Sequence, residues 1–192
     1  MAFDAEKIGA DVRLLAGYAA GAPEAARQLT NRFLPLAYRL AARILADRAE
    51  AEDVAQEAML RLFRAAPGWQ PGQAQVSTWL YRVTANLCTD RLRKRRVLPL
   101  DDVPEMADGQ RSVAEVLMAA DRQAALERAL GHLPERQRLA VVLRHLEGLA
   151  NPEIARIMEI GTEAVESLVA RGKRNLKEAL IGQRDALGYE DD

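Results

Sequence analysis

The chain has 192 residues, a formal net charge of −1 and one cysteine. This length suits one domain of ordinary size or two small ones, and a hydrophobic share of 49% allows a packed core, which argues against a disordered chain. A single cysteine excludes an internal disulfide bond and a cysteine-rich metal site, and no apolar run approaches the roughly 18 residues that cross a bilayer. Aromatic residues are scarce at 5%, whereas alanine, leucine and arginine are abundant, so helices are favoured over sheets.

Between residues 11 and 96, apolar side chains recur every three or four positions, which predicts consecutive amphipathic helices. Glycine and proline interrupt this pattern at 21–23 and 67–72, where a turn and an irregular loop are expected. The repeating apolar positions are Leu14, Leu15, Tyr18, Phe33, Leu36, Leu40, Ile44, Val54, Ala58, Leu62 and Phe63.

Two of these helices carry signals for their N-termini. Asp47, with Glu50 three residues later, is typical of a helix start, and Ser77 is expected to cap a helix over 78–95. Cys88 lies within that helix, where a small buried packing residue is favoured over a redox sensor. The inward stripe of the same helix is predicted at Trp79, Val83, Leu87 and Leu92.

Charged residues are segregated along the chain. Six bases and one acid give residues 82–96 a net charge of +5, whereas six acids and one base give residues 97–121 a net charge of −5. Such segregation indicates surfaces with different partners, although a solvated helix face explains any single run equally well. Because residues 97–111 also contain prolines and lack periodicity, they are interpreted as a linker.

A helical pattern resumes near Val113 and is broken by Gly131. Pro134 suits the first position of the next helix, which Gly148 ends. The apolar stripe of that helix is Leu139, Val142, Leu143 and Leu146.

The predicted fold is therefore all-α, with no strand alternation and no internal repeat. Two small helical domains, at 10–96 and 121–182, are expected to be joined by a flexible acidic linker at 97–120. An acidic tail follows at 183–192.

Residues 151–176 have the spacing of a helix-turn-helix. Asn151 suits a cap, Pro152 a first helical position, and Gly161-Thr162 a turn and cap before a helix over 162–179. Such a helix can place its first residues at base edges and its later cations at phosphates, although a plain helical hairpin is the alternative. The expected DNA contacts are Thr162, Glu163, Glu166, Ser167, Arg171, Lys173 and Arg174.

The helix over 78–95 combines aromatic and basic residues. Arginine binds phosphate or guanine and asparagine pairs with base edges, while the loop before this helix could stack an extruded base, worth about 1–3 kcal/mol. Alternatively, Trp79 and Tyr81 are core aromatics and the arginines form a solvated helix end. The expected contacts to opened DNA are Trp69, Gln70, Trp79, Arg82, Asn86, Arg91, Arg93, Lys94 and Arg95.

The preceding helix presents an acidic face. DNA would repel this face, so a basic protein surface is the more plausible partner. On spacing alone, however, the segment is simply an amphipathic helix. The residues of the face are Glu50, Glu52, Asp53, Gln56 and Glu57.

In this order and spacing, the motifs resemble the sigma-70 family of bacterial RNA polymerase initiation factors. More narrowly, they resemble the extracytoplasmic-function group, which keeps only regions 2 and 4. The stretch AEAEDVAQEAMLRLFRA is similar to region 2.2, which implies that Asp53, Gln56 and Glu57 bind the largest polymerase subunit. The stretch VSTWLYRVTANLCTDRLRKRR is similar to regions 2.3 and 2.4, which melt and read the −10 element.

The C-terminal half completes the resemblance. LPERQRLAVVLRHLEGLANPEIARIMEI is similar to region 4.1 and the start of region 4.2, and GTEAVESLVARGKRNLKEAL to the rest of region 4.2, the −35 reader. Four features depart from the family pattern and imply an unusual −35 sequence. They are Glu159 where glycine is common, Glu166 where lysine is common, Leu168 where arginine is common, and the pair Asn151-Pro152.

The resulting hypothesis is a promoter-specificity subunit that binds core RNA polymerase and promoter DNA in the cytoplasm. Neither a cofactor nor a metal is expected, since His132 and His145 are not spaced as a metal pair, and no constellation of residues indicates an enzyme. The resemblance also implies an anti-sigma factor as a partner. The alternatives are a stand-alone helix-turn-helix regulator and a sigma mimic that sequesters an anti-sigma factor.

Overall fold

The computed structural model describes residues 2–70, 72, 75–97 and 124–186. Every regular element in these ranges is a helix, which confirms the all-α prediction. The predicted linker, apart from its first residue, lies outside the described ranges. The elements are α1 (Ala2–Ala19), α2 (Pro23–Leu45), α3 (Arg48–Ala65), the 3₁₀ turn η1 (Ala66–Gly68), α4 (Val76–Val97), α6 (Glu135–Val141), the π-helical turn η2 (Val142–Leu146), α7 (Asn151–Met158) and α8 (Thr162–Ala186).

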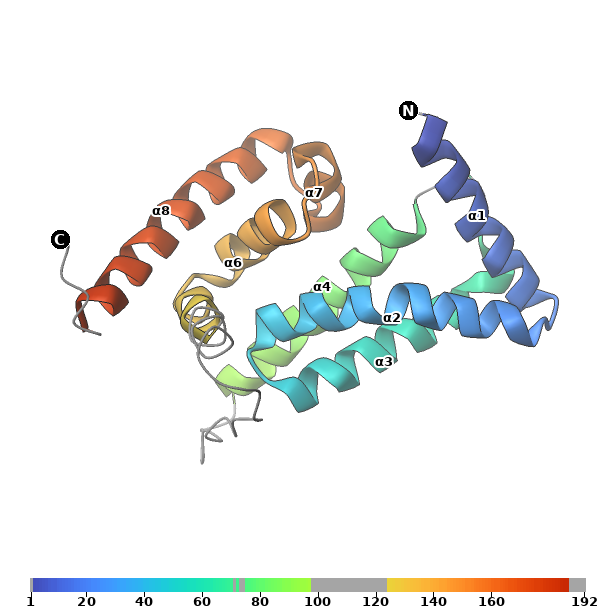
Figure 1. Cartoon of the computed structure of the whole chain (residues 1–192), viewed down its shortest axis with the longest axis horizontal. Coiled ribbons are helices and arrows are strands. Elements are labelled where there is room, and N and C mark those ends of the chain that lie inside the picture. Colours follow the sequence, from blue (N-terminus) through green and yellow to red (C-terminus); the bar gives the residue numbers. More distant parts are fainter. Residues whose placement is uncertain (1, 71, 73–74, 98–123, 187–192) are drawn as a thin grey trace, which may run out of the picture.

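The described helices form two units that pack side by side (Figure 1). The N-terminal unit consists of α1 to α4. The C-terminal unit consists of a helical segment at 124–131 followed by α6, α7 and α8. Helix α4 lies between the units, because it packs on α2 and α3 and also contacts α7.

A tight corner joins α2 to α3. Ala46 adopts a left-handed conformation with φ of 52°, and its N–H donates to the Ala42 carbonyl as α2 ends. Asp47 then caps α3 by accepting a 2.9 Å hydrogen bond from the Glu50 N–H, which confirms the predicted start signal.

Helix α4 starts earlier and buries a different stripe than predicted. The predicted cap at Ser77 is wrong, because the helix begins at Val76 and Ser77 lies in its first turn. The fully buried positions are Leu80, Thr84 and Cys88, which confirms the packing role of the cysteine. Because α4 packs on α2 and α3 of its own unit and also on α7 of the other unit, its buried face is rotated from the one expected. The partly buried positions include the whole predicted stripe, Trp79, Val83, Leu87 and Leu92.

Helices α6 and α8 cross closely. A Cβ at Gly172 would lie 2.6 Å from a Val141 methyl group and 3.2 Å from the Gln137 carbonyl oxygen, so glycine permits this approach. Asn175 lies nearly one turn further along and donates to the Gln137 side chain at 2.9 Å. These contacts fix α8, the expected DNA-reading helix, on α6.

The C-terminal boundaries differ slightly from the predicted ones. Pro134 stands just before α6 rather than at its first position, and Ala150, not Asn151, precedes α7. The Ala150 N–H donates to the Glu153 carboxylate at 3.0 Å. Helix α8 extends to Ala186, beyond the expected end near residue 179. The π-helical turn η2 was not predicted, since apolar spacing does not distinguish it from α-helix.

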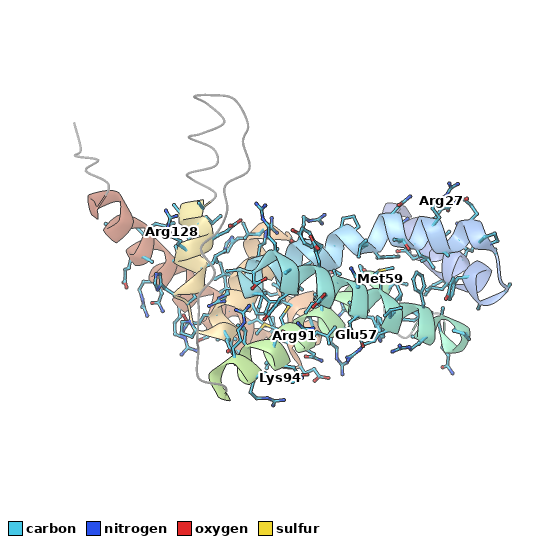
Figure 2. All side chains as sticks on the ribbon, turned by 90° about the horizontal axis from the view of Figure 1, so that it is seen from below. Arg27, Glu57, Met59, Arg91, Lys94 and Arg128 are labelled. Carbon is cyan, nitrogen blue, oxygen red and sulfur yellow. The ribbon has the colours of Figure 1, made fainter. Side chains whose placement is uncertain are left out.

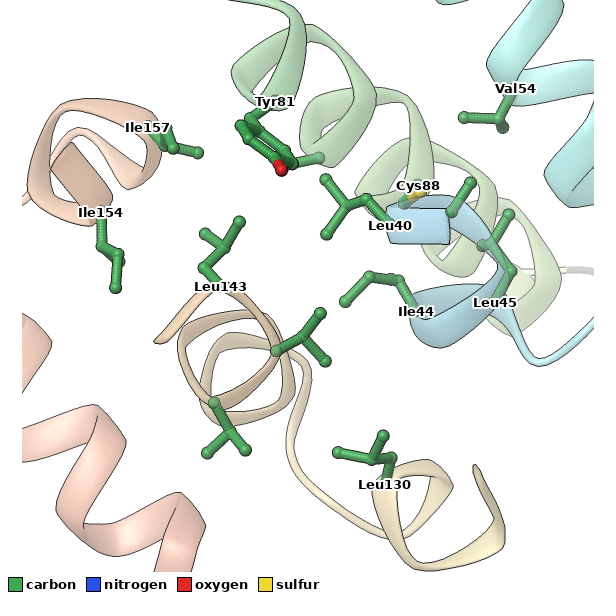
Figure 3. Packing of buried hydrophobic residues seen from close by; sticks show 14 of the residues in the cluster. Leu40, Ile44, Leu45, Val54, Tyr81, Cys88, Leu130, Leu143, Ile154 and Ile157 are labelled. Carbon is green, nitrogen blue, oxygen red and sulfur yellow. The ribbon is translucent and has the colours of Figure 1, made fainter. Parts of the chain in front are cut away.

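Two clusters of buried apolar side chains form the interior. One lies within the N-terminal unit and includes Leu29, Phe33 and Leu62. The other continues from the N-terminal unit into the C-terminal unit. In Figure 3 its members Leu40 and Tyr81 face Leu143, and the two units therefore share an apolar interface.

Candidate polymerase and DNA interfaces

The outward side of α3 carries the residues predicted to bind polymerase. Leu62 and its apolar neighbours face inward, so helical periodicity turns Asp53 and Gln56 to solvent. Glu57 is half-buried and accepts a 2.9 Å hydrogen bond from Arg61. The three predicted residues thus share one helix face.

Leu60 adds an apolar side chain to this face. It is 48% exposed and lies one turn along the helix from Gln56 and Glu57. A single exposed leucine is common on protein surfaces, so Leu60 supports a protein-binding face only together with the charged residues beside it. The prediction missed Leu60, although its position outside the stripe of Val54, Ala58 and Leu62 was a readable signal.

The basic run of α4 adjoins this acidic face. Arg91 lies 3.7 Å from the Asp53 carboxylate, and both side chains are at least a third exposed, so the pair is weak. Figure 2 shows Arg91 and Lys94 in the same part of the molecule as Glu57. A polymerase-binding face and a DNA-binding face would therefore be neighbours on this unit.

The arginines of the run have different environments. Arg93 and Lys94 are exposed, and Arg93 pairs with Asp90 one turn before it, at 2.9 Å. Arg95 instead donates to the Leu45 carbonyl at 3.3 Å and pairs with the carboxylates of the α2–α3 corner. Its distances to Asp47 and Glu50 are 3.3 and 2.9 Å. Arg95 thus has a structural role in addition to the DNA contact predicted for it.

Two tryptophans meet beside the start of α4. The rings of Trp69 and Trp79 lie edge to face with centroids 5.7 Å apart, and both residues are half-buried. Gln70, next to Trp69, is exposed. The two tryptophans predicted to stack bases are therefore in contact with each other, and neither is fully buried.

Arg82 and Asn86 lie one turn apart on α4, and both are exposed. Asn86 faces solvent as the spacing predicted. Arg82, however, forms an ion pair with Glu159, the residue that directly follows α7 in the other unit. Arg82, which was predicted to contact DNA, is therefore paired with a carboxylate of the same chain.

Helix α8 exposes all seven residues predicted to contact the −35 element. Val165 is buried at the crossing with α7, so the opposite side of the first turns is open to solvent. The cations come later on this side, as expected for contacts to phosphates. The acids that come first would be repelled by DNA unless they accept a hydrogen bond from a cytosine amino group. The exposed residues are Thr162, Glu163, Glu166, Ser167, Arg171, Lys173 and Arg174.

Asn151 contacts this surface from α7. Its side-chain amide donates to the Glu166 carboxylate at 3.4 Å. The sequence suggested Asn151 as a helix cap, whereas in the structure its side chain contacts an acid of α8, the helix expected to read DNA.

Within the described part of the chain, no group of three or more acidic, histidine or cysteine side chains could hold a metal ion. Among the helices described, none combines the length and the apolar character needed to span a membrane.

Two family models match the chain. Residues 29–97 match sigma-70 region 2, and residues 123–176 match sigma-70 region 4. The sigma factor SigM of Mycobacterium tuberculosis is 35% identical over 173 residues, which cover 88% of this chain and 84% of that protein. The sigma factor SigE of Mycolicibacterium smegmatis is 33% identical over 80% of this chain and 60% of its own length.

A solved structure shares the fold. The sigma factor RpoE of Bartonella quintana, in complex with the anti-sigma factor NepR, aligns with a TM-score of 0.63 and 20% identity. The alignment covers 80% of this chain and 95% of RpoE. The all-helical pair of units thus defines a region 2 and a region 4 of the sigma-70 type. The chain belongs to the extracytoplasmic-function group of RNA polymerase sigma factors, which bind RNA polymerase and promoter DNA.

Proposed function

We propose that this sigma factor is held on core polymerase by α3, traps opened −10 bases with α4 and the Trp69 loop, and reads duplex −35 DNA with α8. The supporting observation is that one chain presents an acidic face, a basic-aromatic helix and a helix-turn-helix, all exposed, in the family order. It acts in the cytoplasm, where polymerase works, and needs no catalytic chemistry of its own.

For polymerase binding, the proposal assigns Asp53, Gln56 and Glu57, together with the exposed Leu60. Charged residues around an apolar centre raise the rate of association and form the polar rim of such a contact. Asp53→Lys should abolish co-purification with core polymerase without unfolding the chain, because exposed substitutions usually cost within about 0.5 kcal/mol. Glu24→Lys, at an exposed acid of α2, is the matched control. Undiminished capture of polymerase by Asp53→Lys would remove α3 from the interface.

For the −10 element, the exposed cations of α4 meet phosphates while the tryptophan pair stacks bases. Arg93 and Lys94 replaced together by alanine should slow open-complex formation and flatten its salt dependence. The slope of log affinity against log salt concentration should become shallower by about 0.7 to 0.9 for each phosphate that is no longer bound. Arg95 is left intact because it also holds the α2–α3 corner. An unchanged salt slope would contradict the assignment.

For the −35 element, Glu166 is proposed to accept a hydrogen bond from a cytosine amino group, with Asn151 orienting the carboxylate. A good direct pair discriminates bases by about 1–3 kcal/mol. Transcription from a −35 library should therefore favour cytosine at one position with the natural chain and lose that preference with Glu166→Lys. Glu178→Lys, on the same helix, should keep it. The same preference in all three proteins would exclude Glu166 from readout.

An anti-sigma factor is proposed as the regulator, because the chain belongs to this family and shares its fold with a sigma factor solved with such an inhibitor. The protein encoded beside this gene is the candidate to test. Its addition should block transcription by the assembled holoenzyme, and failure to bind the sigma factor would exclude it.

Run-off transcription with core polymerase tests the proposal as a whole. The chain should direct initiation at its promoter and should not shift duplex promoter DNA alone. A stand-alone helix-turn-helix regulator would shift its DNA site without polymerase, and a sigma mimic would never direct initiation.

A further inference from the structure

The basic run of α4 divides into two faces. Arg93 and Lys94 are exposed, and the Arg93 side chain is 76% exposed. Arg91 and Arg95, one turn apart, lie instead beside carboxylates at the start of α3, and the Arg95 side chain is 35% exposed. Helical periodicity explains the division, because residues four positions apart share a face. The positive charge of the run is therefore not directed at a single partner.

All three nitrogens of the Arg95 guanidinium have partners at the α2–α3 corner. Nη1 donates at 3.3 Å to the Leu45 carbonyl, one of the last carbonyls of α2, which lack acceptor partners within the helix. Nη2 donates to Asp47 Oδ2 at 3.3 Å and lies 2.9 Å from Glu50 Oε2, while Nε donates to Glu50 Oε1 at 3.2 Å. One side chain thus links the end of α2, the residue that caps α3 and the first turn of α3.

The two carboxylate oxygens of Asp47 have different partners. Oδ1 accepts from the Glu50 N–H and so caps α3, whereas Oδ2 accepts from Arg95. The contact with Arg95 therefore holds the Asp47 side chain in the orientation that the cap requires. A guanidinium fixes such a geometry with its planar fork of donors, which a lysine ammonium does not have.

The turns that Arg95 holds carry the acidic face of α3. Because α3 begins at Arg48, Asp53 lies in its second turn and Glu57 in its third. Glu50, which the spacing placed on the same acidic face, is half-buried and pairs with Arg95. Glu50 thus supports the face from behind, and a binding face keeps its geometry only when such supporting contacts hold it.

A DNA phosphate is a poor ligand for Arg95. The carboxylates of Asp47 and Glu50 already lie within 3.3 Å of the guanidinium, so one positive and two negative charges give the group a net charge of −1. These acids would repel a phosphate, which would have to displace one of them. The exposed Arg93 and Lys94 are the members of the run that suit phosphates.

We propose that Arg95 is a positioning residue of the polymerase-binding face and not a contact of the −10 DNA. It holds the start of α3 through Asp47 and Glu50, and thereby sets the direction in which Asp53 and Glu57 point. The part that concerns polymerase rests on the proposed function of α3, whereas the ordering of α3 by Arg95 does not.

The first measurement is the affinity of the full-length chain for core polymerase. Arg95→Lys keeps the charge and loses the fork, so it should weaken binding by about tenfold, the scale of one charge-assisted hydrogen bond. Arg27→Lys is the matched control and should bind as tightly as the natural chain. Arg27 is 72% exposed, pairs with Glu24, and lies at the opposite end of the N-terminal unit from Lys94 (Figure 2).

Circular dichroism at the assay temperature establishes that each variant is folded, so that a general loss of stability does not account for weaker binding. If Arg95→Lys fails to fold, Glu50→Gln serves instead, because it removes one charge at the same contact and keeps the shape of the side chain. It should weaken polymerase binding by a smaller factor. A folded variant with the polymerase affinity of the natural chain would overturn the inference.

The second measurement separates positioning from DNA contact. With the sigma factor in excess, so that all polymerase is loaded, the salt dependence of promoter binding reports the phosphates that are bound. Arg95→Ala should leave the slope of log affinity against log salt concentration unchanged. Lys94→Ala, next to it in the run, should make the slope shallower by about 0.7 to 0.9. The same change in both variants would show that Arg95 binds a phosphate and that the inference is wrong.

Hydrogen exchange of the free chain distinguishes a failure of this inference from a failure of the proposed function. Backbone amides of residues 49–57 should exchange faster in Arg95→Lys than in the natural chain, and at the natural rate in Arg27→Lys. Asp53→Lys in the polymerase assay tests the proposed function by itself. Normal polymerase binding by Asp53→Lys would overturn the proposed function, whereas normal exchange in Arg95→Lys would overturn this inference even where Asp53→Lys loses polymerase.

Discussion

Region 2 and region 4 bury their apolar side chains in different ways. Helices α1 to α4 enclose a cluster of their own around Leu29 and Phe33. The buried side chains of region 4, such as Leu143 and Ile154, belong to a cluster that continues into α2 and α4. Separation of the units would leave the region 2 cluster around Leu29 and Phe33 intact, but would expose members of the shared cluster in both regions. The described part of region 4 has no second cluster of its own. Region 4 is therefore the unit whose order depends more on a partner, whether region 2, polymerase or DNA.

The largest expected effect concerns the apolar cluster that lies wholly within region 2. Leu62 is fully buried, whereas Leu60, two residues earlier on α3, is 48% exposed. Leu62→Ala should lower the free energy of unfolding by about 2–5 kcal/mol, because it removes packed atoms and leaves a cavity. Leu60→Ala should change it by less than about 0.5 kcal/mol. Urea denaturation followed by circular dichroism measures both, and equal losses would refute the assignment of a separate core to this unit.

Within region 4, Gly172→Ala should separate α8 from α6. The added Cβ would lie 2.6 Å from a Val141 methyl group, so overpacking should cost about 1–3 kcal/mol, more than the gain of about 1 kcal/mol in helix propensity. Gly131→Ala, where a Cβ meets nothing within 4 Å, is the control and should be neutral or stabilising. Thermal unfolding gives the difference, and a Gly172→Ala protein as stable as the control would show that the crossing tolerates a methyl group.

A buried thiol at the shared interface should make stability depend on alkaline pH. Burial raises the pKa of the Cys88 thiol to about 12, above its value of about 8.5 in an unfolded chain. The neutral thiol therefore stabilises the fold fully below pH 8.5, and this contribution falls toward pH 12 by up to about 1.4 kcal/mol per pH unit. Denaturation measured at pH 8 and at pH 10 gives the free energy of unfolding at each pH. Between these two values the free energy should fall less for Cys88→Ala than for the natural chain. Identical losses would mean that the thiol is accessible in the fold.

The smallest effects concern two residues with a left-handed backbone conformation, Ala46 inside region 2 and Glu159 at the interface between the units. Ala46→Gly should stabilise the chain by up to about 1 kcal/mol, because glycine tolerates φ of 52° at no steric cost. Glu159→Gly should gain less, since it also removes the ion pair with Arg82, worth up to about 1 kcal/mol. Thermal unfolding of the two variants tests this order, and an equal gain would show that the ion pair contributes nothing.

Much of the fold and of the candidate site was predictable because the signals are local. Apolar spacing indicated the helices, Asp47 indicated the start of α3, and the break at Gly161 separated the two helices of the helix-turn-helix. The exposed face of α8, which we propose reads DNA, was predictable for the same reason, since helical periodicity places its polar residues opposite Val165.

Predictions from such local signals were wrong or incomplete where one helix contacts several distant parts of the chain. The buried stripe of α4 is rotated from the predicted one because α4 packs on α2 and α3 and also on α7. Arg95 was predicted only as a DNA contact, yet it also pairs with carboxylates 45 and 48 residues away. Sequence spacing contains no information on such contacts.

The sequence by itself therefore determined which segments are helical, which residues face outward on α3 and α8, and the sigma factor family. The tertiary structure alone decided how region 4 lies on region 2. Glu147 reaches Tyr81 across 66 residues and Arg43 across 104, and Arg138 reaches Ile44 across 94. Periodicity and capping depend on hydrogen bonds within a few residues, whereas a buried carboxylate selects donors by their position in space.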